Sequence, residues 1–223
     1  MDEEAKRRAA VAALDELPAQ GIVGLGSGST ALLFVEELGA RVRAGRRIVG
    51  VPTSESTRVH AASVGIPLLG DEGPWTLDVN VDGADEVSPE LDLIKGGGGA
   101  HAREKIVNYA AAKNVIVVDA SKVSNRLGER RPVPVEVLPF AHGTTRRHLS
   151  HYGEPTLRTS AGEAFRTDAG NFIYDLNTGP IADAARLDHA LHAIPGVVEA
   201  GLFIGRADVV FVAYADVVQR LSR

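Results

Sequence analysis

Apolar residues occur in short runs along the first half of the chain, and amphipathic segments follow several of these runs. The first two runs, residues 22–25 and 48–51, show no strict alternation of apolar and polar positions. Strands covered on both faces of a mainly parallel sheet have this pattern, and alternation of such strands with helices is typical of α/β folds. Further strands are predicted at residues 66–69, 77–81 and 115–118, and helices at residues 5–17, 31–38, 54–64 and 103–112.

The pattern changes near Arg130, because residues 130–139 contain three prolines. Proline has no backbone N–H for a sheet ladder, so this segment suits a connection or an edge strand and argues against a central strand. Beyond it the predicted order is strand, helix, strand, strand, helix, strand, which resembles a ferredoxin-like domain. Helices are predicted at residues 144–151 and 182–193, and strands near residue 156 and at residues 172–176 and 197–202.

These elements predict an α/β protein with two domains. A Rossmann-like domain with a mainly parallel sheet is expected at residues 1–130 and 205–223, and a smaller ferredoxin-like α+β domain at residues 131–204. The last segment is assigned to the first domain since residues 208–213 form another continuous apolar run. A short helix is expected from Asp216.

Composition and charge narrow the classes of function. The 223 residues are 44% hydrophobic and 24% charged, as in ordinary soluble globular proteins. The net charge of -5 argues against a nucleic-acid partner, because phosphate backbones are bound by clustered Lys and Arg. The absence of cysteine excludes disulfides, thiolate metal sites and cysteine nucleophiles. With no signal-type N-terminus and no apolar run of the ~20 residues that a membrane helix needs, we expect a cytoplasmic protein without a membrane partner.

The first glycine-rich turn, G-L-G-S-G-S-T at residues 24–30, joins a predicted strand to a predicted helix. Glycine lets the backbone approach an anion closely, and unpaired N–H groups at a helix start stabilise a phosphate. The dinucleotide fingerprint is not matched, because its third glycine would fall at Ser29, and no Gly-Lys pair of Walker type follows. The segment is either a phosphate-binding loop or a tight turn in which Ser29 or Thr30 caps the helix.

The segment D-G-A-D-E at residues 82–86 follows another predicted strand. Ligands of open α/β sheets bind beyond the carboxyl ends of strands, so Asp82 and Asp85 could point into one crevice. The alternative is an Asx-turn with solvated carboxylates. Glu86 is expected to lie at the surface or to support its neighbours.

The segment K-G-G-G-G at residues 95–99 is the least ordinary in the chain. Four glycines are costly to order and contribute no packing, which favours unusual backbone dihedrals or close approach of a ligand over a flexible linker. Lys95 could stabilise charge that develops on an oxygen. Glu104 follows in the first turn of a helix, where an acidic residue can also simply complement the helix dipole. Ser121 and Lys122 end a later strand and could hold a phosphate or hydroxyl, or lie at the surface.

Four of the seven histidines form two i, i+3 pairs, His148 with His151 and His189 with His192. Such a pair can hold a metal, but neither has an obvious acidic third ligand nearby, so no metal site is predicted. His101 could line a site, although a histidine at a helix start is expected to be exposed.

Several segments together, in order and spacing, resemble the ribose-5-phosphate isomerase type A family: G-L-G-S-G-S-T, V-D-G-A-D-E-V, L-I-K-G-G-G-G-A-x-x-R-E-K-I-V and D-A-S-K. The similarity continues in P-V-P-V-E-V-L-P-F-A, T-D-A-G-N and I-P-G-V-V-E-A-G-L-F, and so covers nearly the whole chain. The resemblance implies an aldose-ketose isomerase of the non-oxidative pentose phosphate pathway, which interconverts D-ribose 5-phosphate and D-ribulose 5-phosphate through an enediol without cofactor or metal. It also implies a homodimer or homotetramer.

The same resemblance implies roles for individual residues. Glu104 matches the catalytic base, and Asp82, Asp85 and Lys95 match residues that hold the sugar oxygens, assist ring opening and stabilise the enediolate. Ser27 stands where threonine is common and His101 where leucine is common; the first keeps a hydroxyl and the second lies outside the catalytic set. The residues that match the substrate-binding loops are Ser27, Gly28, Ser29, Thr30, Gly83, Ala84, Gly96, Gly97, Gly98 and Lys122.

Alternative functions stay open within and outside this superfamily. A sugar-phosphate deaminase would need a histidine-based ring-opening group, and a CoA transferase would need a glutamate nucleophile in a different context. A non-catalytic sugar-phosphate sensor domain would be expected to carry a helix-turn-helix and to lack the base or the lysine. Here both Glu104 and Lys95 are present.

Overall fold

The computed structural model describes residues 3–223, which divide into two compact units. The first unit contains the chain up to Ala84 together with Arg103–Ser121 and Arg206–Arg223, and the second contains Asp85–Ala102 and Lys122–Gly205. These boundaries differ from those expected from the sequence, which assign residues 85–102, 122–130 and 205 to the first domain. The difference arises because these segments form short strands and hydrogen bonds within the second unit.

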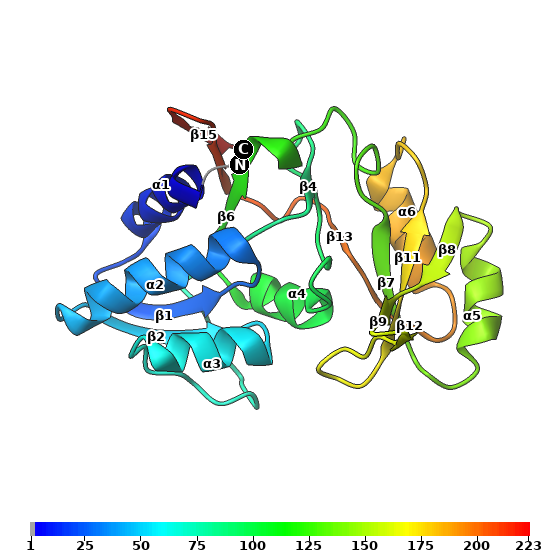
Figure 1. Ribbon diagram of the computed structural model, residues 1–223, viewed down its shortest axis with the longest axis horizontal. Coiled ribbons are helices and arrows are strands. Elements are labelled where there is room, and N and C mark those ends of the chain that lie inside the picture. The colour runs from blue at the N-terminus through cyan, green and yellow to red at the C-terminus, as the bar shows by residue number, and fades with distance from the viewer. Residues whose placement is uncertain (1–2) are drawn as a thin grey trace. The chain divides into compact units, whose positions relative to one another are not determined.

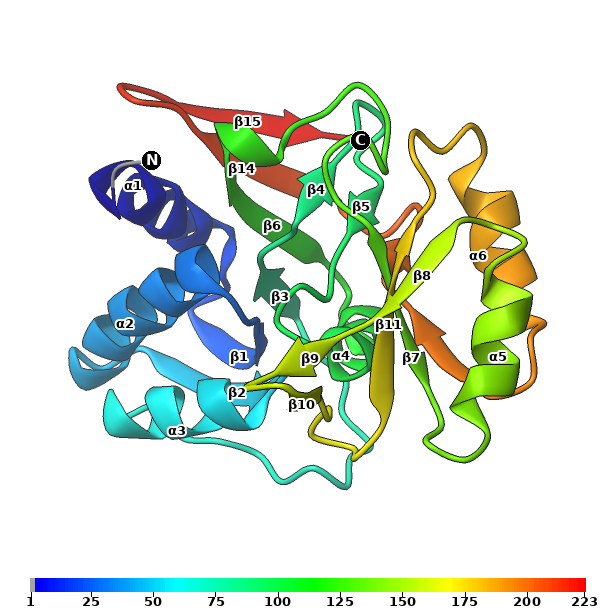
Figure 2. The same ribbon diagram turned by 45° about the vertical axis from the view of Figure 1, so that its right-hand side comes forward.

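The first unit is built on a six-stranded sheet with the strand order β15-β14-β6-β3-β1-β2 (Figure 1 and Figure 2). Neighbouring strands from β14 to β2 are parallel, and β15 runs antiparallel to β14. The mainly parallel sheet predicted from continuous apolar runs is confirmed, and β14 lies beside β6 as expected. The strands are β1 (Gln20–Leu25), β2 (Arg47–Pro52), β3 (Val79–Asp82), β6 (Asn114–Asp119), β14 (Val209–Ala213) and β15 (Val218–Ser222).

Helices cover both faces of this sheet (Figure 2). Three helices, α1 (Glu3–Ala13), α2 (Ser29–Arg43) and α3 (Glu55–Ser63), pack on one face, and α4 (His101–Ala110) packs on the other. Residues Ala5, Ala9 and Ala13 of α1 recur once per turn and are completely buried. Their small side chains allow α1 to lie close to α2 and to the sheet. A short 3-10 turn, η1 (Leu14–Glu16), ends this first helical segment.

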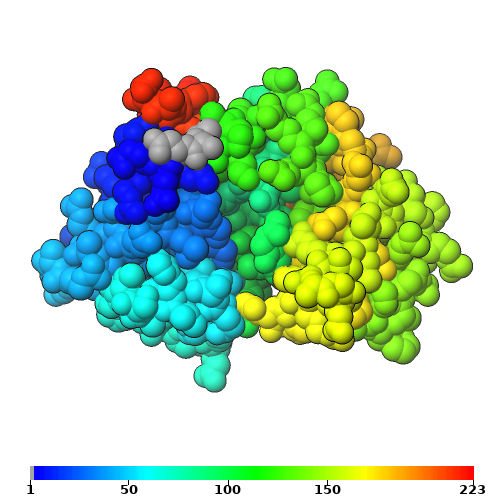
Figure 3. Space-filling model, viewed as in Figure 1, coloured from blue at the N-terminus to red at the C-terminus, as the bar shows by residue number. Residues whose placement is uncertain are grey.

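Two local predictions in the first unit are wrong. The residues after Asp216 form β15 instead of a helix, because they pair with β14, whose backbone groups would otherwise be exposed at a sheet edge. Residues 66–69 form only an isolated bridge between Leu68 and Gly50. The chain then leaves the sheet for the loop of exposed residues 70–74, which protrudes at the bottom of the space-filling view (Figure 3).

The second unit contains a four-stranded antiparallel sheet with the order β12-β7-β11-β8. Leu149 of α5 and Leu191 of α6 share one apolar core with the side chains of β7, so both helices pack on the same face of this sheet (Figure 2). The chain order β7-α5-β8-β11-α6-β12 confirms the predicted ferredoxin-like arrangement. The elements are β7 (Val133–Val137), α5 (His142–Leu149), β8 (Glu154–Leu157), β11 (Phe172–Asn177), α6 (Ala184–His192) and β12 (Val197–Ala200).

The prediction that the proline-rich segment is a connection or an edge strand is wrong. Its strand β7 is a central strand, with β11 on one side and β12 on the other. All five residues of β7 are buried. Pro134 is tolerated since it lies opposite Gly201, just beyond the end of β12, and accepts the Gly201 N–H at 2.7 Å through its carbonyl group. The N–H that proline lacks would face the same side, where the ladder has already ended.

Several two-residue strands were below the length that sequence patterns reveal. β4 (Glu86–Val87), β5 (Leu93–Ile94) and β13 (Leu202–Phe203) form a small antiparallel sheet, and β9 (Thr159–Ser160) pairs with β10 (Glu163–Ala164). A second 3-10 turn, η2 (Ala120–Lys122), follows β6. Among the described residues, no helix is both long and apolar enough to cross a membrane.

Candidate active site

The loop that joins β1 to α2 carries N–H donors, hydroxyl groups and a nearby positive charge. Gly28 has φ +91°, a dihedral that favours glycine, and α2 begins at the next residue. The first turn of α2, which is described in full, contains no acidic side chain, and Ser29 is exposed. The Nζ atom of Lys6 lies 3.1 Å from Ser29 Oγ and 4.0 Å from a carboxylate oxygen of Asp119. This end of the helix therefore suits an anion.

Ser27 lies in the same loop, and its hydroxyl points into a cluster of hydroxyl groups at the start of α3. Its Oγ atom lies 2.8 Å from Thr53 Oγ1 and 3.1 Å from Ser54 Oγ. Thr57 Oγ1 lies 3.3 Å from Ser27 Oγ and donates to the Gly26 carbonyl group at 3.1 Å. The hydroxyl of Ser27 thus helps to fix the loop itself, in addition to any contact with a ligand.

Asp82 ends β3 and ties this end of the strand to the first loop. Its side chain is buried, and Oδ1 accepts the N–H groups of Ser27 at 3.0 Å and Gly83 at 2.7 Å. A Cβ atom at Gly26 would collide with the Asp82 carboxylate, so the close approach requires glycine. Gly83 and Ala84 follow as partly exposed residues. The carboxyl ends of β1 and β3 are therefore joined by a single carboxylate.

Glu104 lies in the first turn of α4, and its side chain is only 5% exposed. One turn further, Val107 fills the space beside Gly24 of β1, where an added Cβ would come within 2.6 Å of Val107 Cγ1. The neighbouring Arg103 instead forms a surface ion pair with Glu55 at 2.9 Å. Glutamate is rarely buried without a specific role, so the position of Glu104 favours chemistry over simple compensation of the helix dipole.

In the second unit, Asp85 and Lys95 lie together with residues 96–99, which we call the glycine loop. Asp85 Oδ2 accepts the Gly97 N–H at 2.7 Å. Lys95 is 3% exposed, and its Nζ atom lies 5.5 Å from the centre of the Phe203 ring. An ammonium group is costly to bury, so Lys95 is a candidate functional group and not a surface lysine.

The glycine loop has the unusual backbone that its sequence predicts. Gly96 has φ +108° and Gly99 has φ +83°, a backbone conformation that residues other than glycine rarely adopt. A Cβ atom at Gly97 would come within 2.8 Å of the Asp85 carboxylate, whereas one at Gly98 would meet no atom within 4 Å. Gly97 and Gly98 are both exposed. Positive φ explains Gly96 and Gly99, and the close approach of the Asp85 carboxylate explains Gly97. At Gly98 neither reason applies, because an added Cβ atom would lie in open space.

The end of β6 continues directly into η2. Asp119 Oδ1 accepts the Ser121 N–H at 2.9 Å and also the Ser121 hydroxyl. Ser121 is thus engaged in the turn, and Lys122, the last residue of η2, is partly exposed. The predicted position of these residues at the end of a strand is confirmed.

Two side chains that flank Asp85 and the glycine loop in the sequence, those of Glu86 and His101, are more buried than expected. Glu86 is completely buried and accepts backbone N–H groups from Gly128 and two residues that follow it, so it is not a surface group. His101 is also completely buried, with Nε2 3.4 Å from the Glu199 carbonyl oxygen. A Cβ atom at Gly96 would come within 2.6 Å of His101 Nδ1, so this histidine packs against the glycine loop.

Lys6 is a candidate site residue that the sequence does not single out, because it sits in the mixed segment E-E-A-K-R-R-A-A. The helical phase of α1 offers the only signal: Ala5 and Ala9 face the core, and Lys6 lies at the flank of that face. Of the predicted site residues, the first unit brings together the β1–α2 loop with Asp82. The second unit brings together Asp85 with Lys95 and the glycine loop.

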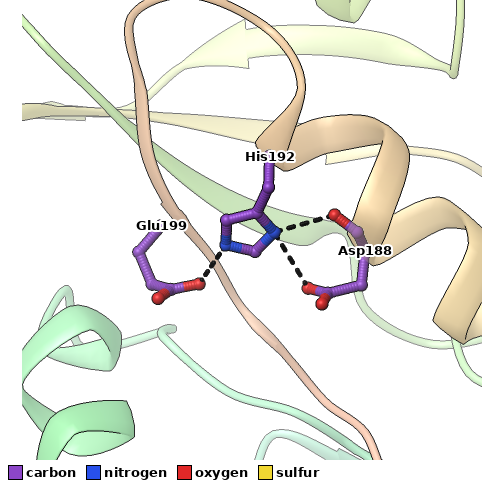
Figure 4. A group of neighbouring side chains, drawn as sticks. All are labelled: Asp188, His192 and Glu199. Carbon is purple, nitrogen blue, oxygen red and sulfur yellow. Dashed lines mark hydrogen bonds and ion pairs between the residues drawn. The ribbon is translucent and has the colours of Figure 1, made fainter.

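One histidine does have acidic neighbours, contrary to expectation. His192 Nε2 lies 2.7 Å from Glu199 Oε1, and Nδ1 lies 2.8 Å from the Asp188 carbonyl oxygen and 3.5 Å from Asp188 Oδ1 (Figure 4). The hydrogen bond with Glu199 is the main cause of a raised pKa at His192. A metal ion takes one nitrogen of an imidazole, whereas the two carboxylates here lie at opposite nitrogens. The arrangement fits a protonated histidine between two acids better than a three-ligand metal site.

A family model and full-length relatives of this chain point to the same protein family. The family model of ribose 5-phosphate isomerase A (phosphoriboisomerase A) matches residues 49–217. The chain is 50% identical over 229 aligned positions to ribose-5-phosphate isomerase A of Rhodopseudomonas palustris strain TIE-1, covering 99% of this chain and 98% of the relative. It is 46% identical over 221 positions to the protein of that name from Desulfatibacillum aliphaticivorans, covering 97% and 96%.

Solved structures agree with this relationship. Ribose 5-phosphate isomerase A from Methanocaldococcus jannaschii superposes with a TM-score of 0.94 at 40% identity, and 100% of both chains is covered. A D-ribose-5-phosphate isomerase in complex with phospho-erythronic acid superposes with a TM-score of 0.95 at 38% identity, again over 100% of both chains. This chain therefore belongs to the ribose-5-phosphate isomerase A family.

Proposed function

We propose that this protein interconverts D-ribose 5-phosphate and D-ribulose 5-phosphate, an aldose-ketose isomerisation of the non-oxidative pentose phosphate pathway. The observation that carries the proposal is the similarity to isomerases of that name over 99% of the chain. The buried Glu104 and Lys95 support it, because the reaction needs one base and one positive group.

The reaction moves hydrogen between two neighbouring carbons. A base removes the proton from C2 of the open aldose, the electron pair forms a C1=C2 double bond, and negative charge moves to O1. Protonation of O1 and loss of the O2 proton shift the charge to O2, and return of a proton to C1 gives the ketose. The proton on C2 is only weakly acidic, so the rate depends on a positioned base and on stabilisation of the charged oxygens.

We assign the proton transfer between C1 and C2 to Glu104, and stabilisation of the enediolate to Lys95. Asp82 and Asp85 hold sugar hydroxyl groups and assist ring opening. The Asp85 carboxylate suits this role, because it also accepts the Gly97 N–H and therefore has a fixed orientation. Gly83 and Ala84, which are partly exposed, and residues 96–98, of which Gly97 and Gly98 are exposed, are assigned to further contacts with the substrate.

The phosphate group is assigned to the start of α2. Gly28, Ser29 and Thr30 supply backbone N–H groups and hydroxyls at the positive end of the helix. Lys6 supports this assignment because its ammonium group already lies 3.1 Å from Ser29 Oγ. Ser27 holds the loop, and Lys122 adds a second positive charge for the phosphate. An anchored phosphate would fix the sugar relative to the base, which lowers the entropic cost of reaching the transition state.

The ligand of one solved relative suggests an inhibitor. That relative is in complex with phospho-erythronic acid, which contains a phosphate and a carboxylate. A carboxylate carries negative charge on two oxygens, as an enediolate shares charge between O1 and O2. We expect phospho-erythronic acid to compete with substrate in this protein, and to bind more weakly when Lys95 is replaced by alanine.

We further propose that the protein acts as a homodimer or homotetramer in the cytoplasm. Family resemblance supports the oligomer, and cysteine-free composition is compatible with the compartment. Sedimentation of the purified protein at assay concentration tests the oligomeric state. A monomer with full activity would contradict it.

The main test measures interconversion of the two pentose phosphates in both directions, with a metal chelator present. Glu104→Gln should retain substrate binding and lose turnover by about 10³-fold, while Glu90→Gln, at an exposed position, should behave as wild type. Lys95→Ala should lose more turnover than binding. Binding without turnover in the wild-type protein would favour the sensor alternative, and ammonia release from an amino-sugar phosphate would favour a deaminase.

A further inference from the structure

The glycine loop is held from outside by an arginine that sequence patterns do not reveal. Arg158 directly follows β8, and its Nη1 atom donates to the Gly96 carbonyl oxygen at 2.8 Å and the Gly97 carbonyl oxygen at 3.2 Å. Both carbonyl groups belong to the loop that follows Lys95. One guanidinium group therefore holds two successive carbonyl groups of this loop.

The guanidinium group is itself locked in place. Its Nε atom donates to Asp175 Oδ2 at 3.0 Å, and its Nη2 atom donates to Asp175 Oδ1. Asp175 lies on β11, the strand that pairs with β8, so both partners stand on the rigid sheet of the second unit. The Arg158 side chain is only 15% exposed. This forked arrangement uses both edges of the guanidinium plane, which an ammonium group cannot reproduce.

A neighbouring aromatic ring holds the other end of the loop. Phe165 lies 5.8 Å from the centre of the Arg158 guanidinium. A Cβ atom at Gly99 would come within 2.5 Å of the Phe165 ring, so the ring packs directly on the Gly99 backbone. Arg158 and Phe165 thus fix the two ends of residues 96–99 from the same side of the second unit.

The peptide group between Gly96 and Gly97 connects the Arg158 guanidinium to the Asp85 carboxylate. In a trans peptide, the C=O of one residue and the N–H of the next point in opposite directions. Here the Gly96 C=O accepts from Arg158, and the Gly97 N–H donates to Asp85 Oδ2 at 2.7 Å. Because one rigid plane links the two hydrogen bonds, rotation of this peptide would break both. The orientation of the Asp85 carboxylate therefore depends on Arg158.

We propose that Arg158, held by Asp175, is a positioning residue for the isomerisation: it fixes the peptide between Gly96 and Gly97 and thereby orients Asp85 and the preceding Lys95. The inference rests on the proposed function of Asp85 and Lys95. Arg158 does not touch the substrate in this scheme. Its loss lowers turnover because the groups that act on the sugar oxygens lose their fixed geometry.

The chain offers a matched control in Arg166. Its Nη1 atom also donates to a backbone carbonyl, that of Gly170 at 2.9 Å, and its guanidinium also lies over an aromatic ring, that of Phe172 at 4.7 Å. It belongs to the same unit, and these two contacts lie outside the glycine loop. Arg166→Ala therefore removes one carbonyl contact and one ring contact of the same kind, without loosening residues 96–99.

The experiment compares kcat and KM of Arg158→Ala, Arg158→Lys and Arg166→Ala in the isomerase assay, together with their melting temperatures. Arg158→Ala should lower kcat by about 50-fold, the scale of a small misplacement of reacting groups, and should change KM less than threefold. Millimolar guanidinium chloride should restore about a tenth of the lost kcat. Arg158→Lys should fall between wild type and Arg158→Ala, because it keeps a charge and loses the fork. Arg166→Ala should stay within twofold of wild type.

The outcomes separate this inference from the proposed function. If wild-type protein interconverts the sugars and folded Arg158→Ala keeps kcat within twofold, the positioning role is wrong although the function stands. If Arg158→Ala loses activity only in proportion to unfolded protein, without rescue by guanidinium, Arg158 is merely structural. If Arg158→Ala does not fold, Arg158→Lys and Asp175→Asn decide: normal kcat in both overturns the inference. Absence of isomerase activity in the wild type would instead refute the proposed function.

Discussion

Glu86 offers the sharpest test of how the chain organises the second unit. Its side chain is completely buried at the start of β4. Oε2 accepts the Gly128 N–H at 3.0 Å and the Arg131 N–H at 3.2 Å, and Oε1 accepts the Arg130 N–H at 3.2 Å. One carboxylate therefore fastens the segment that leads from Lys122 to β7. We expect Glu86→Ala to destabilise this unit strongly.

The magnitude follows from the three hydrogen bonds. A hydrogen bond to a charged group contributes about 1.5–3 kcal/mol. Gly128 is buried, so its N–H would lose a partner without access to water, at about 2 kcal/mol; Arg130 and Arg131 are exposed, so each N–H counts for about 1 kcal/mol. Relief of the cost of burying the carboxylate offsets part of this sum, which leaves about 3 kcal/mol. For a chain of this length that corresponds to a fall in Tm of roughly 6–12 °C.

Urea denaturation followed by circular dichroism gives the free energy of unfolding, and hydrogen exchange reports the three amides directly. Glu86→Gln keeps the shape and one acceptor oxygen, so it should lose about half as much as Glu86→Ala. Glu90→Ala, at an exposed position four residues away, should change stability by less than about 0.5 kcal/mol. A loss below about 1 kcal/mol for Glu86→Ala, with unchanged exchange at Gly128, would refute the reasoning.

Three further predictions concern the first loop and two charged clusters. Thr57→Val removes the hydroxyl that donates to the Gly26 carbonyl, so we expect a severalfold rise in KM with a smaller change in kcat, measured in the isomerase assay. The pKa of Glu16 is lowered below its ordinary value of 4.5, chiefly by the hydrogen bond from Arg220. The ionised carboxylate therefore stabilises the fold by roughly 0.5–1 kcal/mol above the unfolded pKa, and this contribution is lost as the pH falls through the folded pKa. We expect the stability of Glu16→Gln to approach that of wild type in acid. The pKa of His192 is raised above 6.5, chiefly by the hydrogen bond with Glu199. The protonated side chain therefore stabilises the fold fully below the unfolded pKa, and this contribution is lost as the pH rises through the folded pKa. In urea titrations, the stability of His192→Gln should differ most from that of wild type near pH 5 and least near pH 9.

Matched substitutions control these three predictions. Ser56→Ala removes an exposed hydroxyl beside Thr57 and should leave KM unchanged. Asp15→Asn and His189→Gln alter exposed neighbours of Glu16 and His192, and should give pH-stability curves parallel to wild type. A Thr57→Val protein with normal KM, or a stability difference that does not change with pH for Glu16→Gln or His192→Gln, would contradict the corresponding prediction.

The sequence was sufficient for features that depend on local patterns. Continuous apolar runs marked the buried strands of the parallel sheet, because strands covered on both faces need no polar side. The glycine loop was also predictable, since Gly96 and Gly99 adopt positive φ and few other residues do so readily. Asp82 could be placed at the carboxyl end of a strand because the apolar run ends at Val81.

Other features depend on which segments meet across the chain. The prediction for the proline-rich segment failed because the cost of Pro134 depends on what lies opposite it, and β12 ends there. The helix expected after Asp216 is instead β15, since the edge of β14 offers backbone partners to this segment. The first error arises from a hydrogen bond between residues 67 positions apart, and the second from a hairpin whose paired residues lie 5 to 13 positions apart.

The sequence by itself determined the α/β class, the glycine-rich loops and the residue types that suit an isomerase. Only the tertiary structure decided that Lys6 lies beside Ser29, that Glu86 is buried, and that Arg158 holds the carbonyl groups of the glycine loop. The physical reason is the range of the interactions. Helix phase, strand burial and backbone dihedrals are set within a few residues, whereas these side chains acquire their roles from partners 23 to 62 positions away in the chain.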